Sequence, residues 1–346
     1  MTTLDHACSP SNRPPLELVP SLHAVVRPRP IVQVPAMASL YARVDRLARW
    51  PKPVLIRGET GVGKELVAHA LHERGPRQAA PFEAVNCGAL PPNLVEATLF
   101  GHTRGSFSGA VEDHPGLIVA AGVGTLFLDE VGDLPMPAQA ALLRVLSEGM
   151  VRAVGATYEV AVRARVVAAT NRDLDAMCRA GTFREDLYFR LAGITLEVPP
   201  LRERVAEIRA LVEQTIEVTN ATVPTCVRGV SPGALHLLER YRWPGNVREL
   251  KGVVERAMVF CDTPQLEPRN LPPAIVDGSK QHRTGEAVTG DDLKSRVRRF
   301  EAEVIVGKLN EGLTQAEAAR QLGVPLRTLV DKMKRLGIRA RPDFQV

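Results

Sequence analysis

The sequence has no apolar run long enough to cross a bilayer, no charged-then-apolar leader and no two cysteines spaced as C-x-x-C. Leu117–Val123 is one of its longest apolar runs, whereas a membrane-spanning helix needs roughly 18–20 such residues. The odd number and wide separation of the cysteines exclude a disulfide framework and a zinc knuckle; they are Cys8, Cys87, Cys178, Cys226 and Cys261. These absences predict a cytoplasmic protein that has reduced cysteines and does not enter a membrane.

Composition and length indicate a globular protein. Hydrophobic residues make up 45% of the 346 residues and charged residues 24%, which excludes a fully disordered chain, a collagen-like fibre and a small disulfide-stapled protein. A chain of this length is enough for two or three domains. The formal net charge of +5 permits nucleic-acid binding without requiring it, so the location of the positive charge matters more than its sum.

The sequence pattern divides the chain into five segments. Seven of the 27 prolines lie in the first 35 residues, and we expect a disordered tail over residues 1–30. Residues 31–203 alternate short apolar runs with helical periodicity, which predicts an α/β domain with a parallel sheet. The pattern predicts a helical subdomain over residues 204–275, a polar linker over residues 276–290 and a third unit over residues 291–346. The expected strands are Val54–Ile56, Phe82–Val85, Thr125–Leu128, Val166–Ala169 and Thr195–Val198.

A phosphate-binding loop is predicted between the first strand and the helix that follows it. The segment from Gly58 to Lys64 fits the pattern G-x-x-x-x-G-K. Its glycines let backbone N–H groups close around a phosphate at a helix N-terminus, and the lysine supplies a positive charge. Glu65 stands where the generic pattern has a serine or threonine that binds magnesium. The predicted nucleotide-binding residues are Gly58, Glu59, Thr60, Gly61, Val62, Gly63, Lys64 and Glu65.

Two adjacent carboxylates end the third expected strand. Asp129 and Glu130 follow Thr125–Leu128, 65 residues after Lys64. Asp129 is suited to organise Mg²⁺, through water, and Glu130 to orient or deprotonate an attacking water molecule. An acidic pair alone is often a solvated turn, but together with the phosphate-binding loop it predicts an ATPase core that binds ATP and Mg²⁺.

Polar and basic residues near other strand ends are further candidates. Asn86 and Asn171 each follow an expected strand, and the carboxyl ends of parallel strands form the ligand-binding edge of such a sheet. Each could be an ordinary Asx turn, or could reach the γ-phosphate or its attacking water. Arg184 and Arg190 lie six residues apart, and a solvated helix surface is their more common explanation.

Five further motifs, in the same order, complete a resemblance to the bacterial enhancer-binding activators of sigma-54 RNA polymerase, a branch of the AAA+ ATPases. They are Leu99–His102, Gly105–Ala110, Phe183–Leu187, Pro199–Arg204 and Trp243–Leu250. The resemblance covers roughly residues 31–338, and Glu65 after the lysine is also usual in this branch. It implies an α/β P-loop AAA+ subdomain with a parallel sheet flanked by helices, then an all-helical lid and a small helix-turn-helix domain.

The resemblance also implies a role for each catalytic candidate. Asn86 corresponds to the residue that restrains the catalytic glutamate, Asn171 to the first sensor, and Arg248, in the lid, to the second sensor. Arg184 and Arg190 correspond to arginine fingers, which enter the site of a neighbouring subunit. Fingers supplied in this way imply a ring, usually a hexamer.

The segment Gly105–Ala110 corresponds to the loop with which the family contacts sigma-54, and Phe107 is expected to be its exposed anchor. Serine replaces the family's alanine at position 106 and its threonine at position 108. Loss of a threonine methyl that is buried at the contact costs on the order of 1 kcal/mol. The predicted contact residues are Gly105, Ser106, Phe107, Ser108, Gly109 and Ala110.

The C-terminal unit is strongly basic. Between Lys294 and Arg341 there are twelve basic and five acidic residues, an excess of seven that exceeds the net charge of the whole chain. Three helices are expected, with a tight turn at Gly323 between the last two; they are Asp292–Leu309, Thr314–Leu322 and Pro325–Leu336. Three short basic helices could form a protein-interaction bundle, but the unit resembles the Fis-type DNA-binding domain of these activators, in which the first helix pairs two subunits. The expected DNA contacts are Arg327, Thr328, Lys332, Lys334 and Arg335.

We therefore expect a transcriptional activator that binds double-stranded DNA at enhancer-like sites, forms a ring and uses ATP hydrolysis to convert the closed sigma-54 RNA polymerase complex into the open one. A sensing domain before the ATPase would need roughly 100 residues, so control by a separate regulatory protein or by expression level is expected. Two alternatives stay open. One is a regulator of sigma-70 promoters whose ATPase module serves only assembly. The other is an AAA+ remodeller unrelated to transcription, which the basic helix-turn-helix argues against.

Overall fold

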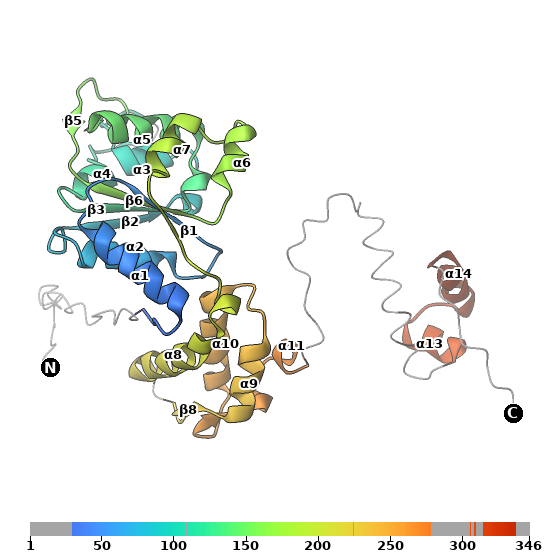
Figure 1. Ribbon diagram of the computed structural model, residues 1–346. Helices are drawn as coiled ribbons and strands as arrows, with labels where there is room; N and C mark the ends of the chain where they lie inside the picture. Colours follow the sequence, from blue (N-terminus) through green and yellow to red (C-terminus); the bar gives the residue numbers. More distant parts are fainter. Residues whose placement is uncertain are drawn as a thin grey trace, which may run out of the picture. The chain divides into compact units, whose positions relative to one another are not determined.

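The computed structural model describes residues 30–107, 109–223, 225–277, 305, 308 and 314–336. The chain divides into two units, one within Met1–Lys280 and one within Gln281–Val346 (Figure 1). None of the helices in the described ranges combines the length and the apolar character that a membrane crossing requires.

A five-stranded parallel sheet lies at the centre of the first unit, in the order β2-β3-β6-β1-β7 (Figure 1). The predicted strands are confirmed as β1 (Val54–Arg57), β2 (Phe82–Asn86), β3 (Thr125–Asp129), β6 (Arg165–Thr170) and β7 (Thr195–Glu197). β1 pairs with β6 and β7, and β3 pairs with β2 and β6, all in parallel register. All these strands therefore end at the same edge of the sheet, where a ligand site is expected.

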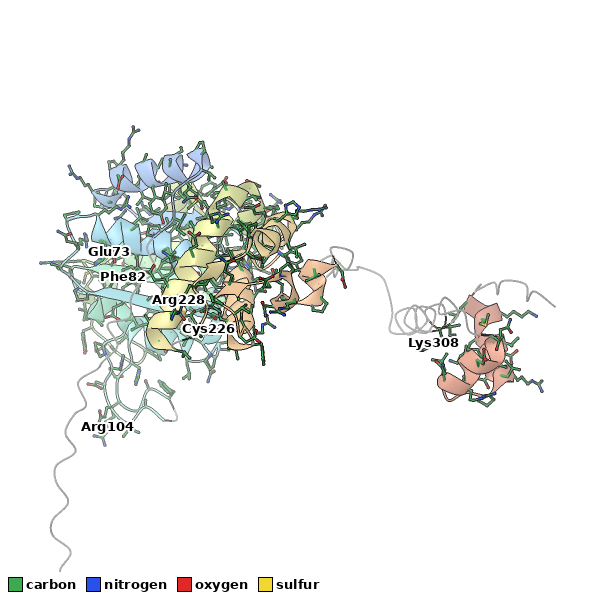
Figure 2. The ribbon with its side chains drawn as sticks, turned by 90° about the horizontal axis from the view of Figure 1, so that it is seen from below. Glu73, Phe82, Arg104, Cys226, Arg228 and Lys308 are labelled. Carbon is green, nitrogen blue, oxygen red and sulfur yellow. The ribbon has the colours of Figure 1, made fainter. Side chains whose placement is uncertain are left out.

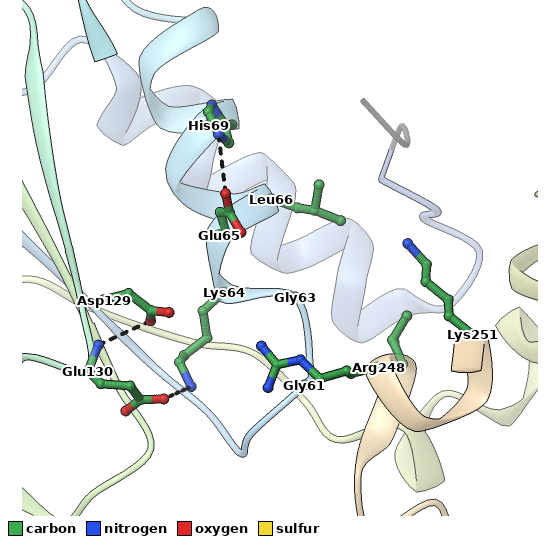
Figure 3. A pocket seen from close by; sticks show the side chains of 11 residues that line it. Gly61, Gly63, Lys64, Glu65, Leu66, His69, Asp129, Glu130, Arg248 and Lys251 are labelled. Carbon is green, nitrogen blue, oxygen red and sulfur yellow. Dashed lines mark hydrogen bonds and ion pairs between the residues drawn. The ribbon is translucent and has the colours of Figure 1, made fainter. Parts of the chain in front are cut away.

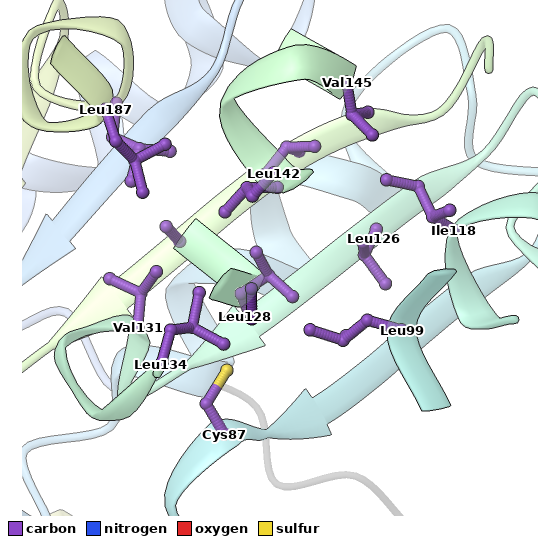
Figure 4. Close-up of a cluster of buried hydrophobic side chains, with 14 of the residues drawn as sticks. Cys87, Leu99, Ile118, Leu126, Leu128, Val131, Leu134, Leu142, Val145 and Leu187 are labelled. Carbon is purple, nitrogen blue, oxygen red and sulfur yellow. The ribbon is translucent and has the colours of Figure 1, made fainter. Parts of the chain in front are cut away.

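Helices cover both faces of the sheet, so its central strands are apolar along their length. Leu55, Leu126 and Leu128 point to one face and belong to the buried cluster in Figure 4. Val54 and Ile56, on alternate positions of β1, point to the other face. The helices on the first face are α3 (Val95–Phe100), α4 (Leu117–Ala120), α5 (Met136–Glu148), α6 (Leu174–Arg179) and α7 (Glu185–Leu191), and those on the second are α1 (Pro35–Ala48) and α2 (Lys64–Glu73). A short antiparallel pair, β4 (Met150–Val151) and β5 (Val160–Ala161), follows α5.

The lid follows the sheet and consists mainly of α8 (Ile208–Thr222), α9 (Pro232–Arg240), α10 (Asn246–Val259) and α11 (Pro273–Val276). Its core surrounds Trp243, which is fully buried. Ser231 begins α9 as predicted, because its side chain accepts a hydrogen bond from the Ala234 N–H. The prediction of an all-helical lid is wrong in one detail, since β8 (Gly229–Val230) and β9 (Gln265–Leu266) form a parallel pair. Strands of two residues are too short for an alternating pattern to appear in the sequence.

In the second unit, the structure describes α13 (Gln315–Gln321) and α14 (Leu326–Leu336), which confirm two of the three helices expected there. Thr314 and Glu317 form a capping box at the start of α13, and Gly323 makes the turn with a φ of 66°. The expected tail over residues 1–29 and most of the expected linker and first helix lie outside the described residues, although Ile305 and Lys308 are helical.

Candidate nucleotide-binding site

The predicted phosphate-binding loop, Gly58–Lys64, connects the end of β1 to the start of α2. Gly61 and Gly63 have φ angles of 79° and 100°, a left-handed conformation that residues with a β-carbon rarely adopt. A β-carbon on Gly61 would lie 2.3 Å from the carbonyl oxygen of Gly245 in the lid. The loop therefore needs glycine at position 61 both for its backbone conformation and for its close contact with the lid.

Lys64 connects this loop to the end of β3. Its side chain is 6% exposed, and its Nζ donates to the carbonyl oxygens of Gly58 at 3.1 Å and Glu59 at 3.4 Å. The same Nζ lies 3.2 Å from Glu130 Oε1, an ion pair drawn in Figure 3. A buried cation at the start of a helix, beside a glycine loop, is an arrangement that binds phosphate oxygens.

Asp129 and Glu130 stand together at the end of β3, where Asp129 Oδ1 accepts a hydrogen bond from the Glu130 N–H at 3.1 Å. Burial and the neighbouring Glu130 charge raise the pKa of Asp129, which a cation beside the pair would offset. Within the described residues no three His, Cys, Asp or Glu side chains form a metal-binding group. Two carboxylates next to a phosphate-binding loop suit Mg²⁺, which commonly takes its remaining ligands from water and substrate phosphates.

The two asparagines at strand ends behave differently. Asn171 donates from its backbone N–H to Glu130 Oε2 at 3.0 Å and from Nδ2 to Thr60 Oγ1 at 2.7 Å, so it joins the acidic pair to the phosphate-binding loop. Asn86 lies opposite Asp129 in the sheet, but its Oδ1 accepts from the N–H groups of the next turn at 3.0 and 3.2 Å. The described side chains of Asn86 and Glu130 share no hydrogen bond, so in this structure Asn86 forms an Asx-type cap and its restraining role stays a prediction.

A cavity of about 440 Å³ lies between the phosphate-binding loop, the end of β3 and the lid (Figure 3). Arg248 reaches it from α10, and its backbone N–H donates to the Gly61 carbonyl at 3.2 Å. Lys251 lines the same cavity one turn further along α10, and burial lowers its pKa. The prediction did not include Lys251; its spacing of three residues from Arg248 on one helix is the signal that could have identified it.

Arg184 and Arg190 are not among the residues that line this cavity. Arg184 precedes α7 and makes two hydrogen bonds to Asp186, at 2.7 and 3.0 Å, while Arg190 Nε lies 3.4 Å from Ser147 Oγ. Phe189, which is next to Arg190, is 66% exposed. A helix that carries two arginines and an exposed aromatic ring away from its own subunit's cavity is suited to contact another molecule.

Gln139, which the sequence analysis did not single out, holds this region in place. Its side chain on α5 is fully buried. Its Nε2 donates to the carbonyls of Leu134 at 2.8 Å and Thr182 at 3.2 Å, and its Oε1 accepts from the Arg184 N–H at 2.9 Å. It thus ties the segment that follows the acidic pair to the start of the arginine-bearing helix.

The predicted sigma-54 loop lies in the segment of residues 101–115, which protrudes from the first unit beside Arg104 in Figure 2. His102 and His114 pair through their backbones at its base, at 2.8 and 2.9 Å, and their rings stack 5.7 Å apart. Phe107, expected to be exposed, is half-buried because its ring packs edge-on against His102 at 5.0 Å. Ser108 lies outside the described residues.

Two polar groups that link the loop to the lid also escaped prediction. Glu59 makes paired hydrogen bonds with Arg202 at 2.7 and 2.9 Å, and Asn246 Nδ2 donates to Glu59 Oε2 at 3.1 Å. Arg204, which is 4% exposed, donates to the Val62 carbonyl. Arg202 and Arg204 lie in a motif that carried the family resemblance, yet no function was assigned to them, because their partners are distant in sequence.

In the second unit, Arg327, Thr328 and Lys334 are exposed on α14 and Lys332 is half-buried, whereas the side chain of Arg335 lies outside the described part. Leu326 and Val330, one turn apart on the same helix, are 47% and 41% exposed. The side chains available on this helix therefore include two apolar ones beside the predicted basic contacts.

Comparison with known proteins gives matches along most of the chain. Residues 31–197 match the family described as "Sigma-54 interaction domain", and residues 202–288 match the "AAA+ ATPase lid domain". The response regulator protein PilR of Pseudomonas aeruginosa is 44% identical over 316 residues, which are 91% of this chain and 71% of PilR. The nitrogen fixation protein AnfA of Azotobacter vinelandii is 43% identical over 87% of this chain and 56% of AnfA.

The fold is also similar to solved structures. The crystal structure of NtrX from Brucella abortus has a TM-score of 0.72 and 33% identity, over 89% of this chain and 69% of that chain. The same protein has been solved in complex with ATP, with a TM-score of 0.69 and 32% identity over the same shares of both chains.

Proposed function

Because this chain belongs to the family of sigma-54-dependent transcriptional activators, we propose that it binds DNA upstream of a promoter and remodels the closed sigma-54 RNA polymerase complex into an open one. The chain is an ATPase of the AAA+ class. One observation carries the proposal: Lys64, the Asp129 and Glu130 pair, and Arg248 reach one cavity from the loop, a strand end and the lid.

In this proposal the phosphate-binding loop and Lys64 hold the phosphates of ATP, and Arg248 and Lys251 contact them from the lid. Asp129 binds Mg²⁺ through water, and the ion neutralises the charge of the phosphate oxygens when it is bound. Glu130 orients the attacking water, because its two oxygens are already held by Lys64 and by the Asn171 N–H.

Arg184 and Arg190 act in the site of a neighbouring subunit, since both lie away from the cavity of their own. A comparable arginine in GTPases accelerates hydrolysis by about 10³–10⁵. Hydrolysis then depends on assembly, for which a ring, usually a hexamer, is the arrangement we propose. The exposed Phe189 supplies an apolar contact on the same helix.

The loop around Phe107 is the proposed contact with sigma-54. Phe107 packs on His102 in this structure, and the glycines at positions 105 and 109 have left-handed φ angles of 79° and 108° with no atom near the place of a β-carbon. Such a loop can change its backbone without steric hindrance. Release of Phe107 from His102 would present it to sigma-54.

The second unit is the proposed DNA reader. Arg327, Thr328 and Lys334 are exposed on α14 for contacts with base edges or phosphates. Leu326 and Val330 offer apolar contacts of the kind that thymine methyl groups accept in the major groove. We propose that this helix enters the major groove, and that dimers formed through this unit bind half-sites about one helical turn apart.

The direct test is promoter melting by purified components. A sigma-54 promoter, sigma-54 holoenzyme and this chain are incubated with ATP or with a non-hydrolysable analogue, and unpaired thymines are detected with permanganate. The proposal expects melting with ATP only, and none for Glu130→Gln. Melting that is equal with the analogue, or absent although ATP is hydrolysed, would refute it.

A further inference from the structure

Three consecutive residues of the phosphate-binding loop contact one turn of the lid, residues 243–248, which we name the lid turn. Glu59 Oε2 and the Thr60 carbonyl both accept hydrogen bonds from Asn246 Nδ2, each at 3.1 Å. The Gly61 carbonyl accepts the Arg248 N–H at 3.2 Å. The loop that surrounds the phosphates is thus bonded to the lid through side chain and backbone alike.

Asn246 is the centre of these contacts. It is fully buried, and its Oδ1 accepts the N–H of Leu201 at 2.8 Å, so its amide group joins the loop, the segment before the lid and the lid itself. An unmade hydrogen bond at such a buried amide costs about 1–3 kcal/mol. The sets of donors and acceptors on the three segments therefore have to match.

The backbone of the lid turn is strained. Trp243 and Asn246 have φ angles of 53° and 51°, and with Glu130 they are the non-glycine residues of the described chain that have positive φ. The left-handed conformation costs roughly 1–2 kcal/mol for a residue such as tryptophan and less for asparagine. Strained residues of this kind gather at functional sites, where their surroundings hold them in place.

A continuous path of hydrogen bonds leads from this turn to the acidic pair. Glu130 Oε2 accepts from the Asn171 N–H, Asn171 Nδ2 donates to Thr60 Oγ1, and the Thr60 carbonyl accepts from Asn246, at 3.0, 2.7 and 3.1 Å. On the other side, Arg202 holds Glu59 with two hydrogen bonds, and this pairing lowers the pKa of Glu59. Glu59 is therefore an ionised acceptor that faces the Asn246 amide.

We propose that Glu59, Arg202 and Asn246 form a latch through which the nucleotide in the phosphate-binding loop sets the position of the lid. Asn246 is a positioning residue, since it contacts the loop and does not line the cavity. The latch rests on the proposed nucleotide site and adds to it a route by which phosphate binding is transmitted to α10.

The test exchanges the donor and the acceptor of the latch. Asn246→Asp places a carboxylate against the Glu59 carboxylate and removes the donor, so it opens the latch. In the double variant Glu59→Gln with Asn246→Asp, the new amide at position 59 donates to the new carboxylate and closes it again. Arg209→Ala, which removes an exposed ion pair on α8, is the matched lid control.

The readout is the lid and not turnover. A Trp50→Phe background leaves Trp243, the other of the two tryptophans, as the reporter of the lid turn. ADP binding is measured by calorimetry, and hydrogen exchange of α10 and Trp243 emission are measured with and without ADP. For the unaltered chain and for Arg209→Ala, we expect ADP to slow exchange of the first turn of α10 at least about 3-fold, which is a coupling of about 0.7 kcal/mol.

Asn246→Asp should lose this protection, and the double variant should regain at least half of it. Equal protection in Asn246→Asp and the unaltered chain, or a double variant no better than Asn246→Asp, would overturn the latch. If Asn246→Asp does not fold, the double variant must fold and respond to ADP, and its failure to do so also overturns it. Failure of the unaltered chain to bind ADP would instead overturn the proposed nucleotide site.

Discussion

The buried side chain of Gln139 offers the sharpest prediction about how the acidic pair and the arginine-bearing helix depend on each other. Gln139→Met keeps the length and approximate volume of the side chain but removes all three of its hydrogen bonds. The carbonyls of Leu134 and Thr182 and the N–H of Arg184 are then left without this partner. Each unsatisfied buried group costs about 1–3 kcal/mol, and two of these three contacts are only partly buried, so we expect a loss of about 2–5 kcal/mol.

Turnover should fall more than binding in this variant. The segment that Gln139 holds carries Arg184, and a displacement of about 1 Å in a catalytic group costs up to about 10²-fold in rate. We therefore expect kcat to decrease at least about 10-fold while the affinity for ADP changes less than about 3-fold, because Gln139 does not line the cavity.

The assay combines urea unfolding, ADP calorimetry and ATP turnover on one preparation. Arg144→Gln on the same helix is the control, since it removes exposed ion pairs that contribute about 1 kcal/mol or less. An unfolding free energy within about 0.5 kcal/mol of the unaltered chain, or a loss of ADP affinity at unchanged kcat, would refute the reasoning.

Other predictions concern the remaining contacts. Arg190→Ala and Lys64→Ala should each abolish turnover, the first with ADP binding intact, and a mixture of the two should recover activity because an arginine of one subunit serves the site of the next; an inactive mixture contradicts the trans assignment. Lys334→Ala should weaken DNA binding similarly for all sequences and reduce the salt slope by about 1, whereas Leu326→Ala should leave the slope unchanged and reduce the preference for thymine over uracil in the site, both measured by fluorescence anisotropy. His102→Ala should release Phe107 and increase its accessibility to limited proteolysis around the loop, and unchanged cleavage would show that the ring contact does not hold it.

The parts of the fold that local patterns determine were predictable. The strands followed from short apolar runs, and the starts of α9 and α13 followed from Ser231 and Thr314, whose side chains cap the next turn. The position of Asp129 and Asn171 followed from topology, because parallel strands end at one edge.

Contacts between distant segments were not predictable from the sequence. Asn246 was expected only as a helix start, but its amide group serves Glu59, which lies 187 residues earlier. Gln139 appeared as an ordinary position on a helix, because nothing local indicates that it faces Leu134 and Thr182. The burial of Phe107 likewise depends on the ring of His102, which only the folded loop brings beside it.

The central claim is that the ATPase acts on sigma-54, and trapping the complex tests it most directly. The chain is mixed with purified sigma-54 and either ADP alone or ADP with aluminium fluoride, a mimic of the transition state, and the mass of the products is measured by analytical ultracentrifugation. We predict a stable complex with aluminium fluoride, none with ADP alone, and none for Phe107→Ala under either condition. If the chain binds DNA but forms no complex with sigma-54 in the presence of aluminium fluoride, the claim is contradicted and a regulator of other promoters is favoured.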